Sequence, residues 1–365
     1  WDGRFGLVIC TDILMYSPGP ARPTGGAGAV AILIGPNAFL CVESPLKCFS
    51  NIDVYDFYNP TLRGEVVGYP VVDGKLSIET YYQLLDECYE GFKKKFKQAK
   101  GRNFSLESDV EFSAFHSPFP KMPSKALARL VFGDYIDSLS SPSCSCSFPY
   151  SVPSEVSKKV SYFLSSPSSH ETTTTKPSFL DKELERAFVQ ISKQLFEKVN
   201  EPSLLASKRI GNLATGSLWS CLYSLLASPQ FRQKLGGKQG GETNGVGGER
   251  RILMFSYGSG ASASLFSFLL YKTDTEEFDQ SFPSFERRLD NRKQLSPASF
   301  FRLFDGAEQA IEKLGEEKEN GKGNLCGELP VHGPKKGFFE PGDWFLKRVD
   351  SQKRRAYEKF MPAGS

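Results

Sequence analysis

The sequence predicts an α/β fold, because stretches typical of strands alternate along the chain with stretches typical of helices. Three observations carry this prediction: a branched, apolar run at residues 5–15, a helical repeat of apolar residues from Ser77, and a second strand-like run at residues 251–257. The 365 residues suffice for about two ordinary domains or for one large α/β unit with a substantial buried core. With 39% hydrophobic and 24% charged residues, the composition is that of a globular protein and excludes disorder throughout.

The charges of the chain nearly balance, with 45 Lys and Arg against 42 Asp and Glu. No global field therefore favours nucleic acid or an anionic membrane as a partner, and a bound anion must meet a local basic patch. No stretch reaches the roughly 18 apolar residues of a membrane span. Among eight cysteines only Cys144 and Cys146 are close neighbours, so we expect reduced thiols in an intracellular protein. The cytoplasm is the default compartment, because any targeting leader is expected upstream of Trp1.

The first two strands are predicted at residues 5–15 and 28–35, as buried strands of a mixed or parallel sheet. The loop at residues 17–26 joins them and is rich in proline and glycine. Its glycines allow close backbone approach and its prolines restrict its conformers, so it either lines a site or only turns the chain.

The next elements are a helix and a strand that leads to a histidine. Apolar residues recur at helical spacing from Ile78 to Phe92, which predicts an amphipathic helix. Residues 109–115 then alternate like a strand and end at His116. A proline-containing turn leads to a helix over residues 121–139, which tolerates Pro123 because this residue falls in its first turn.

Three stretches have the composition of insertions rather than core. Residues 140–177 are dominated by Ser, Pro and Thr and are expected to form a mobile insertion. Residues 236–248 are glycine-rich, and residues 312–337 mix charges with glycine, so both are expected at the surface.

His116 is the first candidate for chemistry, because it is one of only three histidines and lies at a predicted strand end. The alternative is a histidine that only hydrogen-bonds the following turn. Lys121 and Lys125 follow at i, i+4 spacing on one helix face, an arrangement that suits a phosphorylated ligand. The alternative for both is a pair of solvated surface lysines.

The glycine turn at residues 258–263 fits a loose dinucleotide fingerprint. The next strand-like segment, residues 266–271, comes too soon for the helical crossover of a parallel βαβ unit, so a nicotinamide site is not expected. Tyr257 also stands where the serine-hydrolase elbow has its first glycine. What remains is a turn whose N–H groups and Ser259 hydroxyl face a ligand carbonyl, or a plain strand-ending turn.

Asn212 and Cys10 are two further residues of interest. Asn212 precedes a predicted apolar helix at residues 218–226, where it either caps the helix or directs its amide at a substrate oxygen. Cys10 lies in an apolar strand and is interpreted as a core residue, not a nucleophile.

Seven segments, which run from the first residue nearly to the last, form a recognisable set. They are WDGR at 1–4, ARPTGGAGAV at 21–30, YDFY at 55–58, YPVVDGKLS at 69–77, FHSP at 115–118, FSYGSG at 255–260 and RVD at 348–350. Together, and in this order, they resemble the eukaryotic hydroxymethylglutaryl-CoA synthase family.

The resemblance implies a thiolase-like, layered αβαβα fold. Residues 1–72 are then the remainder of the N-terminal half, residues 73–272 the C-terminal half, and residues 273–365 a family-specific extension. It also implies an acyltransferase that condenses acetyl-CoA with acetoacetyl-CoA and water to HMG-CoA, in the mevalonate route to isoprenoids and sterols. Coenzyme A thioesters are substrates, no further cofactor is implied, and family members are homodimers.

The resemblance also assigns site residues. His116 matches the histidine that engages the acetoacetyl thioester, and Asn212 matches the asparagine beside it. The positions expected to contact substrate or coenzyme A are Thr24, Ser77, Lys121, Lys125, Asn212 and Ser259. The acids expected to support the site are Asp12 and Asp56.

The sequence departs from the family in two places. Pro20 replaces a family asparagine, which removes a side-chain amide from that contact. The nucleophilic cysteine and the proton-abstracting glutamate of the family lie upstream of its WDGR segment, and this sequence starts at Trp1. We therefore expect a piece of a longer synthase that is inactive alone. The alternatives are another thiolase-superfamily acyl synthase that uses carrier-bound substrates, and a non-catalytic CoA-binding protein.

Overall fold

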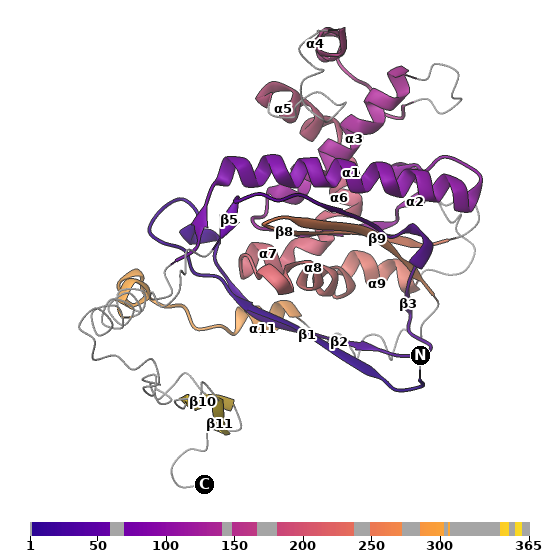
Figure 1. Cartoon of the computed structure of the whole chain (residues 1–365). Helices are drawn as coiled ribbons and strands as arrows, with labels where there is room; N and C mark the ends of the chain where they lie inside the picture. Colours follow the sequence, from indigo (N-terminus) through magenta and orange to yellow (C-terminus); the bar gives the residue numbers. More distant parts are fainter. Residues whose placement is uncertain are drawn as a thin grey trace. The chain divides into compact units, whose positions relative to one another are not determined.

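A mixed five-stranded sheet lies at the centre of the larger of two units in the computed structural model (Figure 1). This unit comprises residues 1–58 and 69–292, and the other comprises residues 59–68 and 293–365. The structure describes these residues: 2–58, 69–140, 148–165, 181–236, 249–271, 285–302, 306, 344–349 and 355–359.

The strand order in the sheet is β3-β9-β8-β7, and β4 also pairs with β9. The five strands are β3 (Leu40–Val42), β4 (Cys48–Asn51), β7 (Phe112–Phe115), β8 (Arg251–Gly258) and β9 (Ser262–Leu270). β7 and β8 run parallel, with Phe115 opposite Phe255, whereas β8 and β9 form an antiparallel hairpin. The hairpin confirms that no helical crossover follows the glycine turn, as the sequence predicted.

Each face of this sheet packs against its own set of helices, because successive strand residues point to opposite faces. Leu253 and Phe255 lie in a core with α1 (Gly74–Lys100), α3 (Met122–Ser140) and α5 (Lys182–Ile191). Ile252 and Met254 lie in a second core with α8 (Ser217–Leu226). Figure 1 shows α1 on one side of the sheet and α7 (Leu205–Arg209), α8 and α9 (Pro229–Gly236) on the other.

The predicted helices are confirmed with small shifts of their ends. α1 begins at Gly74 because the Asp73 carboxylate accepts hydrogen bonds from the backbone N–H groups of Lys75 and Leu76. It ends at Gly101, whose φ of 70° is the left-handed conformation typical of a helix C-terminus. The predicted strand at residues 109–115 is shorter in the structure, because Asp109 belongs to the short helix α2 (Leu106–Asp109).

The prediction for the first two strands is wrong in its pairing and burial. β1 (Gly6–Ile13) and β2 (Ala27–Ile34) form an antiparallel, two-stranded sheet of their own. One face packs on the chain before α8, where Leu213 lies against Gly28 and Gly216 lies near the Cys10 carbonyl. On the other face the side chains of Leu7, Ile9 and Ile13 are more than half exposed. The apolar runs in the sequence predicted these two strands, but they did not show how the strands pair or what covers each face of the sheet.

The predicted insertion at residues 140–177 contains a helix that its composition did not indicate, α4 (Ser154–Ser165), whose Val160 is fully buried. The predicted insertions at residues 236–248 and 312–337 lie outside the described residues, apart from Gly236 at the end of α9. The domain boundaries predicted at residues 72 and 272 stay predictions. None of the described helices is both long enough and apolar enough to span a membrane.

The other described elements are short. In the larger unit they are η1 (Arg22–Thr24), η2 (Ser44–Leu46), β5 (Phe57–Tyr58), β6 (Val71–Val72), α6 (Lys193–Val199), η4 (Glu201–Leu204), η5 (Ala214–Gly216) and α11 (Phe285–Asp290). In the smaller unit β10 (Trp344–Val349) pairs with β11 (Arg355–Lys359) in antiparallel fashion.

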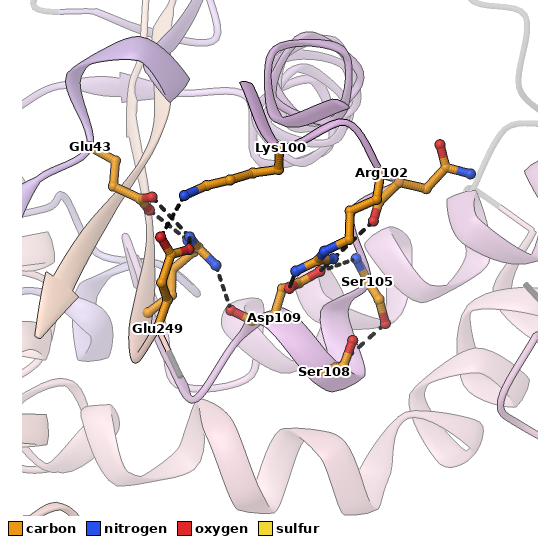
Figure 2. Close-up of polar contacts among 9 residues, drawn as sticks. Glu43, Lys100, Arg102, Ser105, Ser108, Asp109 and Glu249 are labelled. Carbon is orange, nitrogen blue, oxygen red and sulfur yellow. Dashed lines mark hydrogen bonds and ion pairs between the residues drawn. The ribbon is translucent and has the colours of Figure 1, made fainter. Parts of the chain in front are cut away.

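Buried ion pairs hold the end of the sheet at which β8 begins (Figure 2). The Arg251 guanidinium is 1% exposed and donates to the carboxylate of Glu43 at 2.5 and 2.8 Å. It also donates to the Asp109 carbonyl oxygen and pairs with Glu249, which in turn pairs with Lys100. This network lies at the amino ends of the parallel strands, so it stabilises the fold at the end opposite to His116.

Candidate functional site

His116 lies directly after β7, at the carboxyl end of the parallel pair, which is where α/β sheets commonly carry their sites. Its backbone N–H donates to the Phe255 carbonyl at 2.8 Å, and its own carbonyl accepts from the Tyr81 hydroxyl at 3.0 Å. The side chain is 8% exposed. These bonds fix the backbone, and within the described residues no hydrogen bond engages the ring nitrogens of His116.

Burial lowers the pKa of His116 from an ordinary 6.5 to about 4. The imidazole is therefore neutral at pH 7, with one N–H that donates and one nitrogen that accepts. A neutral imidazole can donate a hydrogen bond to a carbonyl oxygen without the free-energy cost of a buried charge.

Tyr257 lies next to His116, and Asp56 connects Tyr257 to the glycine turn. The Tyr257 ring centre lies 6.3 Å from that of His116, and the Tyr257 hydroxyl donates to Asp56 at 2.6 Å. Asp56 is fully buried and also accepts from the backbone N–H of Gly260 at 2.9 Å. The hydroxyls of Ser259 and Ser77 complete its hydrogen bonds. Asp56 thus holds three predicted site positions together: its own, Ser77 and Ser259.

The hydrogen bonds of Asp56 determine its protonation state. Burial raises the pKa of this carboxyl group, but the donors Tyr257, Ser259, Gly260 and Ser77 outweigh burial and leave the pKa below 3.8. Asp56 is therefore a carboxylate at neutral pH. Burial, and after it the hydrogen bond to Asp56, raise the pKa of Tyr257. The Tyr257 hydroxyl therefore stays protonated and remains a donor.

Asn212 and Thr24 form a second cluster, with Tyr16. The Asn212 backbone N–H donates to the Thr24 carbonyl at 2.8 Å, and its side-chain amide donates to the Tyr16 hydroxyl at 3.4 Å. The Asn212 side-chain oxygen accepts from the Ala214 backbone N–H at 2.9 Å. The asparagine therefore stabilises the turn before α8 and directs its amide at Tyr16. It is not the helix cap that one interpretation of the sequence predicted, because the N-cap of α8 is Gly216 and no side chain caps it.

Glycines allow the two loops of this cluster to touch. A Cβ atom on Gly26 would lie 2.8 Å from the Ile210 carbonyl oxygen, and one on Gly211 would lie 2.5 Å from the Gly25 carbonyl oxygen. Gly211 also has a φ of 104°. The glycines of the proline-glycine loop therefore serve close backbone approach, which brings Thr24 to Asn212.

Two contacts join the clusters to each other and to α8. The Tyr16 ring packs edge-on against Phe57, the residue after Asp56, with ring centres 6.2 Å apart. Asp12 accepts from the Thr215 hydroxyl at 2.9 Å, which fixes the turn leading into α8. This contact ties Asp12 to the chain before α8, and its supporting role stays a prediction.

Buried serines hold the segment that follows His116. The Ser117 backbone N–H donates to the Ser217 hydroxyl at 3.1 Å, and the Ser117 hydroxyl shares a hydrogen bond with Ser207 at 2.6 Å. These contacts tie the residue after His116 to the first residue of α8 and to α7. Sequence reasoning missed these serines, since nothing local indicates that they meet.

Lys121 and Lys125 lie one turn apart at the start of α3, but their surroundings differ. Lys121 is exposed, and the described residues offer it no ion pair. The Lys125 ammonium lies 2.7 Å from the Glu185 carboxylate. The predicted basic ridge therefore presents one solvated lysine and one that is already neutralised.

The structure thus gathers the predicted residues into two linked clusters and one helix start. Tyr16 and Tyr257 were missed as partners, although each ends a strand-like run beside a predicted site segment. Pro20 precedes η1 and provides no side-chain amide, as the sequence indicated. The described residues contain no group of three or more His, Cys, Asp or Glu side chains arranged for a metal.

A separate pocket of about 390 Å³ lies between β2, α8 and α11, lined among others by Val30, Tyr223 and Arg288. None of the predicted site residues lines it.

Sequence comparison gives matches over the whole described region. The family description "Hydroxymethylglutaryl-coenzyme A synthase C terminal" matches residues 40–360, and the corresponding N-terminal description matches residues 1–39. The mitochondrial hydroxymethylglutaryl-CoA synthase of Rattus norvegicus is 37% identical over 370 residues, which cover 98% of this chain and 63% of the relative. The cytoplasmic one of Homo sapiens is 36% identical, with 98% and 62% covered. The chain therefore spans less than two thirds of these relatives.

Solved structures show the same fold. MvaS in complex with 3-hydroxy-3-methylglutaryl coenzyme A gives a TM-score of 0.65 at 24% identity, covering 98% of this chain and 67% of MvaS. PksG, an HMG-CoA synthase from Bacillus subtilis, gives 0.60 at 20% identity, with 98% and 67% covered. These likenesses confirm the predicted thiolase-like α/β fold.

Proposed function

Because the chain belongs to the hydroxymethylglutaryl-CoA synthase family, we propose that it forms the acetoacetyl-CoA side and the coenzyme A site of such an acyltransferase. In the proposed reaction, acetyl-CoA, acetoacetyl-CoA and water give HMG-CoA and free coenzyme A. The resemblance assigns acceptor-side and coenzyme A-binding positions to residues of this chain, and it assigns the nucleophilic cysteine and the base to none of them. The proposal for these 365 residues is therefore acceptor binding and activation.

The observation that carries the proposal is the buried, neutral His116 at the carboxyl end of β7, beside Tyr257. When the carbanion of the acetyl group adds to the ketone of acetoacetyl-CoA, a C–C bond forms and negative charge develops on the ketone oxygen. A neutral imidazole N–H stabilises that charge by a hydrogen bond, and burial strengthens the bond because water does not screen it. Asp56 contributes indirectly by fixing Tyr257 and the Ser259 turn.

Asn212 and the lysines have different proposed roles. The Asn212 amide, held by the turn before α8, is directed toward the Tyr16 side of the site and supplies a donor to the thioester. The exposed Lys121 pairs with a phosphate of coenzyme A, which a nearly neutral protein otherwise attracts only weakly.

The test is a fusion that places this chain after the upstream part of the N-terminal family domain, taken from the rat mitochondrial relative. With both thioesters present, the fusion should release free coenzyme A in proportion to added acetoacetyl-CoA. A well-folded fusion that shows no such release would refute the proposed function.

The carrier-bound alternative gives a different substrate profile. For a coenzyme A enzyme, Lys121→Ala raises KM for acetoacetyl-CoA about tenfold and leaves KM for the pantetheine thioester unchanged. If the fusion without this substitution uses acetoacetyl-CoA and the acetoacetyl-pantetheine thioester equally well, the substrate is more plainly one bound to a carrier protein than one bound to coenzyme A.

Assembly and location are part of the proposal. We propose a homodimer, testable by sedimentation of the fusion. We also propose a cytoplasmic location, although the similar proteins include both mitochondrial and cytoplasmic synthases. Microscopy of the tagged protein in its own cells tests this location.

A further inference from the structure

The Glu185 carboxylate is held between two helices by two different donors. Its Oε1 atom lies 2.7 Å from the Lys125 ammonium of α3, and its Oε2 atom accepts from the Tyr82 hydroxyl of α1 at 3.0 Å. The side chains of Lys125 and Glu185 are 29% and 17% exposed. The pair is therefore screened less than a surface ion pair but can still be reached from solvent.

The backbone of α5 fixes Glu185 in this position. The Asp181 carboxylate caps the helix by accepting from the backbone N–H groups of Glu183 and Leu184. Leu184 and Phe188 are buried on either side of Glu185, and the Phe188 ring packs 4.9 Å from that of Phe132 in α3. The carboxylate is thus presented to Lys125 by an anchored helix rather than by a loop.

The two lysines at the start of α3 therefore differ in charge balance. Lys125 donates its backbone N–H to the Lys121 carbonyl, so their side chains leave the helix one turn apart. Only Lys125 has a carboxylate partner within the part of the chain that the structure describes. The charge of Lys121 is thus fully available to an anionic ligand, whereas the charge of Lys125 is partly neutralised by Glu185.

We infer that Glu185 sets the affinity for coenzyme A, because a phosphate group of the ligand must displace the Glu185 carboxylate from Lys125. This inference rests on the proposed function. The exchange replaces one ion pair by another, so it does not leave the ammonium without a partner. It also leaves the carboxylate bonded, since Tyr82 still donates to it. Glu185 tunes the affinity for the ligand and does not take part in the chemistry.

Burial and then the charge of Glu185 raise the pKa of Tyr82, so this hydroxyl remains a donor at all relevant pH values. A competing carboxylate lowers affinity for the polyanionic ligand and favours release of free coenzyme A. We therefore expect coenzyme A to bind more weakly than it would to the two lysines without Glu185.

Glu185→Gln tests this inference, because the glutamine oxygen still accepts from Tyr82 while the competing charge is gone. The matched control is Glu183→Gln, two residues earlier on α5, where an 81% exposed side chain pairs with Lys159. Titration calorimetry of the 365-residue chain with coenzyme A gives the dissociation constants. We expect about five- to tenfold tighter binding for Glu185→Gln, and less than a twofold change for the control.

A double-mutant cycle with Lys125→Met adds a readout that a structural role would not move. Lys125→Met should weaken binding more in the Glu185→Gln background than in the wild type, and Glu185→Gln should steepen the salt dependence of binding. Unchanged or weaker binding by a Glu185→Gln variant that unfolds like the wild type would overturn the inference alone. Absence of coenzyme A binding by the wild type would instead refute the proposed function and the inference with it.

Discussion

The Tyr257 hydroxyl donates to the Asp56 carboxylate at 2.6 Å, and this bond connects the end of β8 with the residue before β5. Tyr257 also faces the His116 ring, and Asp56 also holds the backbone of Gly260. Asp56, although far from His116 in the sequence, therefore holds in place both Tyr257, which packs beside the imidazole, and the glycine turn.

Asp56→Asn should destabilise the chain by about 1–3 kcal/mol, because one carbonyl oxygen cannot accept from all the donors that the carboxylate satisfies. In the fusion it should also lower kcat. Tyr257→Phe removes a single donor and should cost about 1 kcal/mol. Urea unfolding of both variants measures these losses, and an Asp56→Asn chain as stable as the wild type would contradict the role given to Asp56.

His116 should make the stability of the chain depend on pH. Because burial lowers its folded pKa to about 4, the unfolded chain binds more protons between pH 4 and 6.5. The contribution of His116 to the free energy of unfolding is therefore complete above pH 6.5. As the pH falls from 6.5 to about 4, the chain loses up to about 3 kcal/mol of this free energy.

The His116→Asn variant isolates this contribution, since every other titrating group is retained. Urea unfolding at pH 7 and pH 4.5 should show a smaller fall in stability for the variant than for the wild type. Equal falls in both proteins would show that His116 is not held neutral by burial.

Arg251→Met should destabilise the chain by about 3–5 kcal/mol, because it leaves the buried Glu43 carboxylate without its guanidinium partner. The double variant Arg251→Met/Glu43→Leu should recover much of that loss, since both charges are removed together. The neighbouring Arg250→Met is the control, because Arg250 pairs with Glu111 in a more exposed place. A loss below about 1 kcal/mol for Arg251→Met would contradict the stabilising role of this network.

Gly211→Ala should be far more damaging than Gly101→Ala, although both glycines have positive φ. At Gly101 an added Cβ meets nothing within 4 Å, so the cost is the backbone conformation alone, about 1–2 kcal/mol. At Gly211 the Cβ would also press on the Gly25 carbonyl and displace Asn212. Unfolding midpoints compare the two variants directly, and similar losses would show that the two loops separate at little cost.

Local patterns predicted the elements of this fold better than their partners. The helical repeat after Ser77 and the proline in the first turn of α3 depend only on neighbours in the sequence, and both helices are present. The burial of β1 and β2 depends on what covers each face, and here the prediction was wrong for Leu7 and Ile9. The composition of residues 140–177 did not predict α4, because Ser, Pro and Thr dominate this segment. The helix nevertheless forms and buries Val160.

The site shows the same division. His116 was found from its place at a strand end, whereas the bond between Tyr257 and Asp56 joins segments that no local pattern relates. The pairing of Lys125 with Glu185 depends on where α5 packs against α3, so the spacing of the two lysines could not indicate it. Long-range contacts, not residue types, are what the structure adds.

The most direct test of the proposed role of His116 separates the two half-reactions in the fusion. The first half-reaction is transfer of a labelled acetyl group from acetyl-CoA to the cysteine, and the second is condensation with acetoacetyl-CoA. His116→Ala should lower the condensation rate about a hundredfold or more and leave acetylation within a few-fold of the wild type. Equal loss of both half-reactions by a folded His116→Ala fusion would contradict the assignment of His116 to the acceptor ketone.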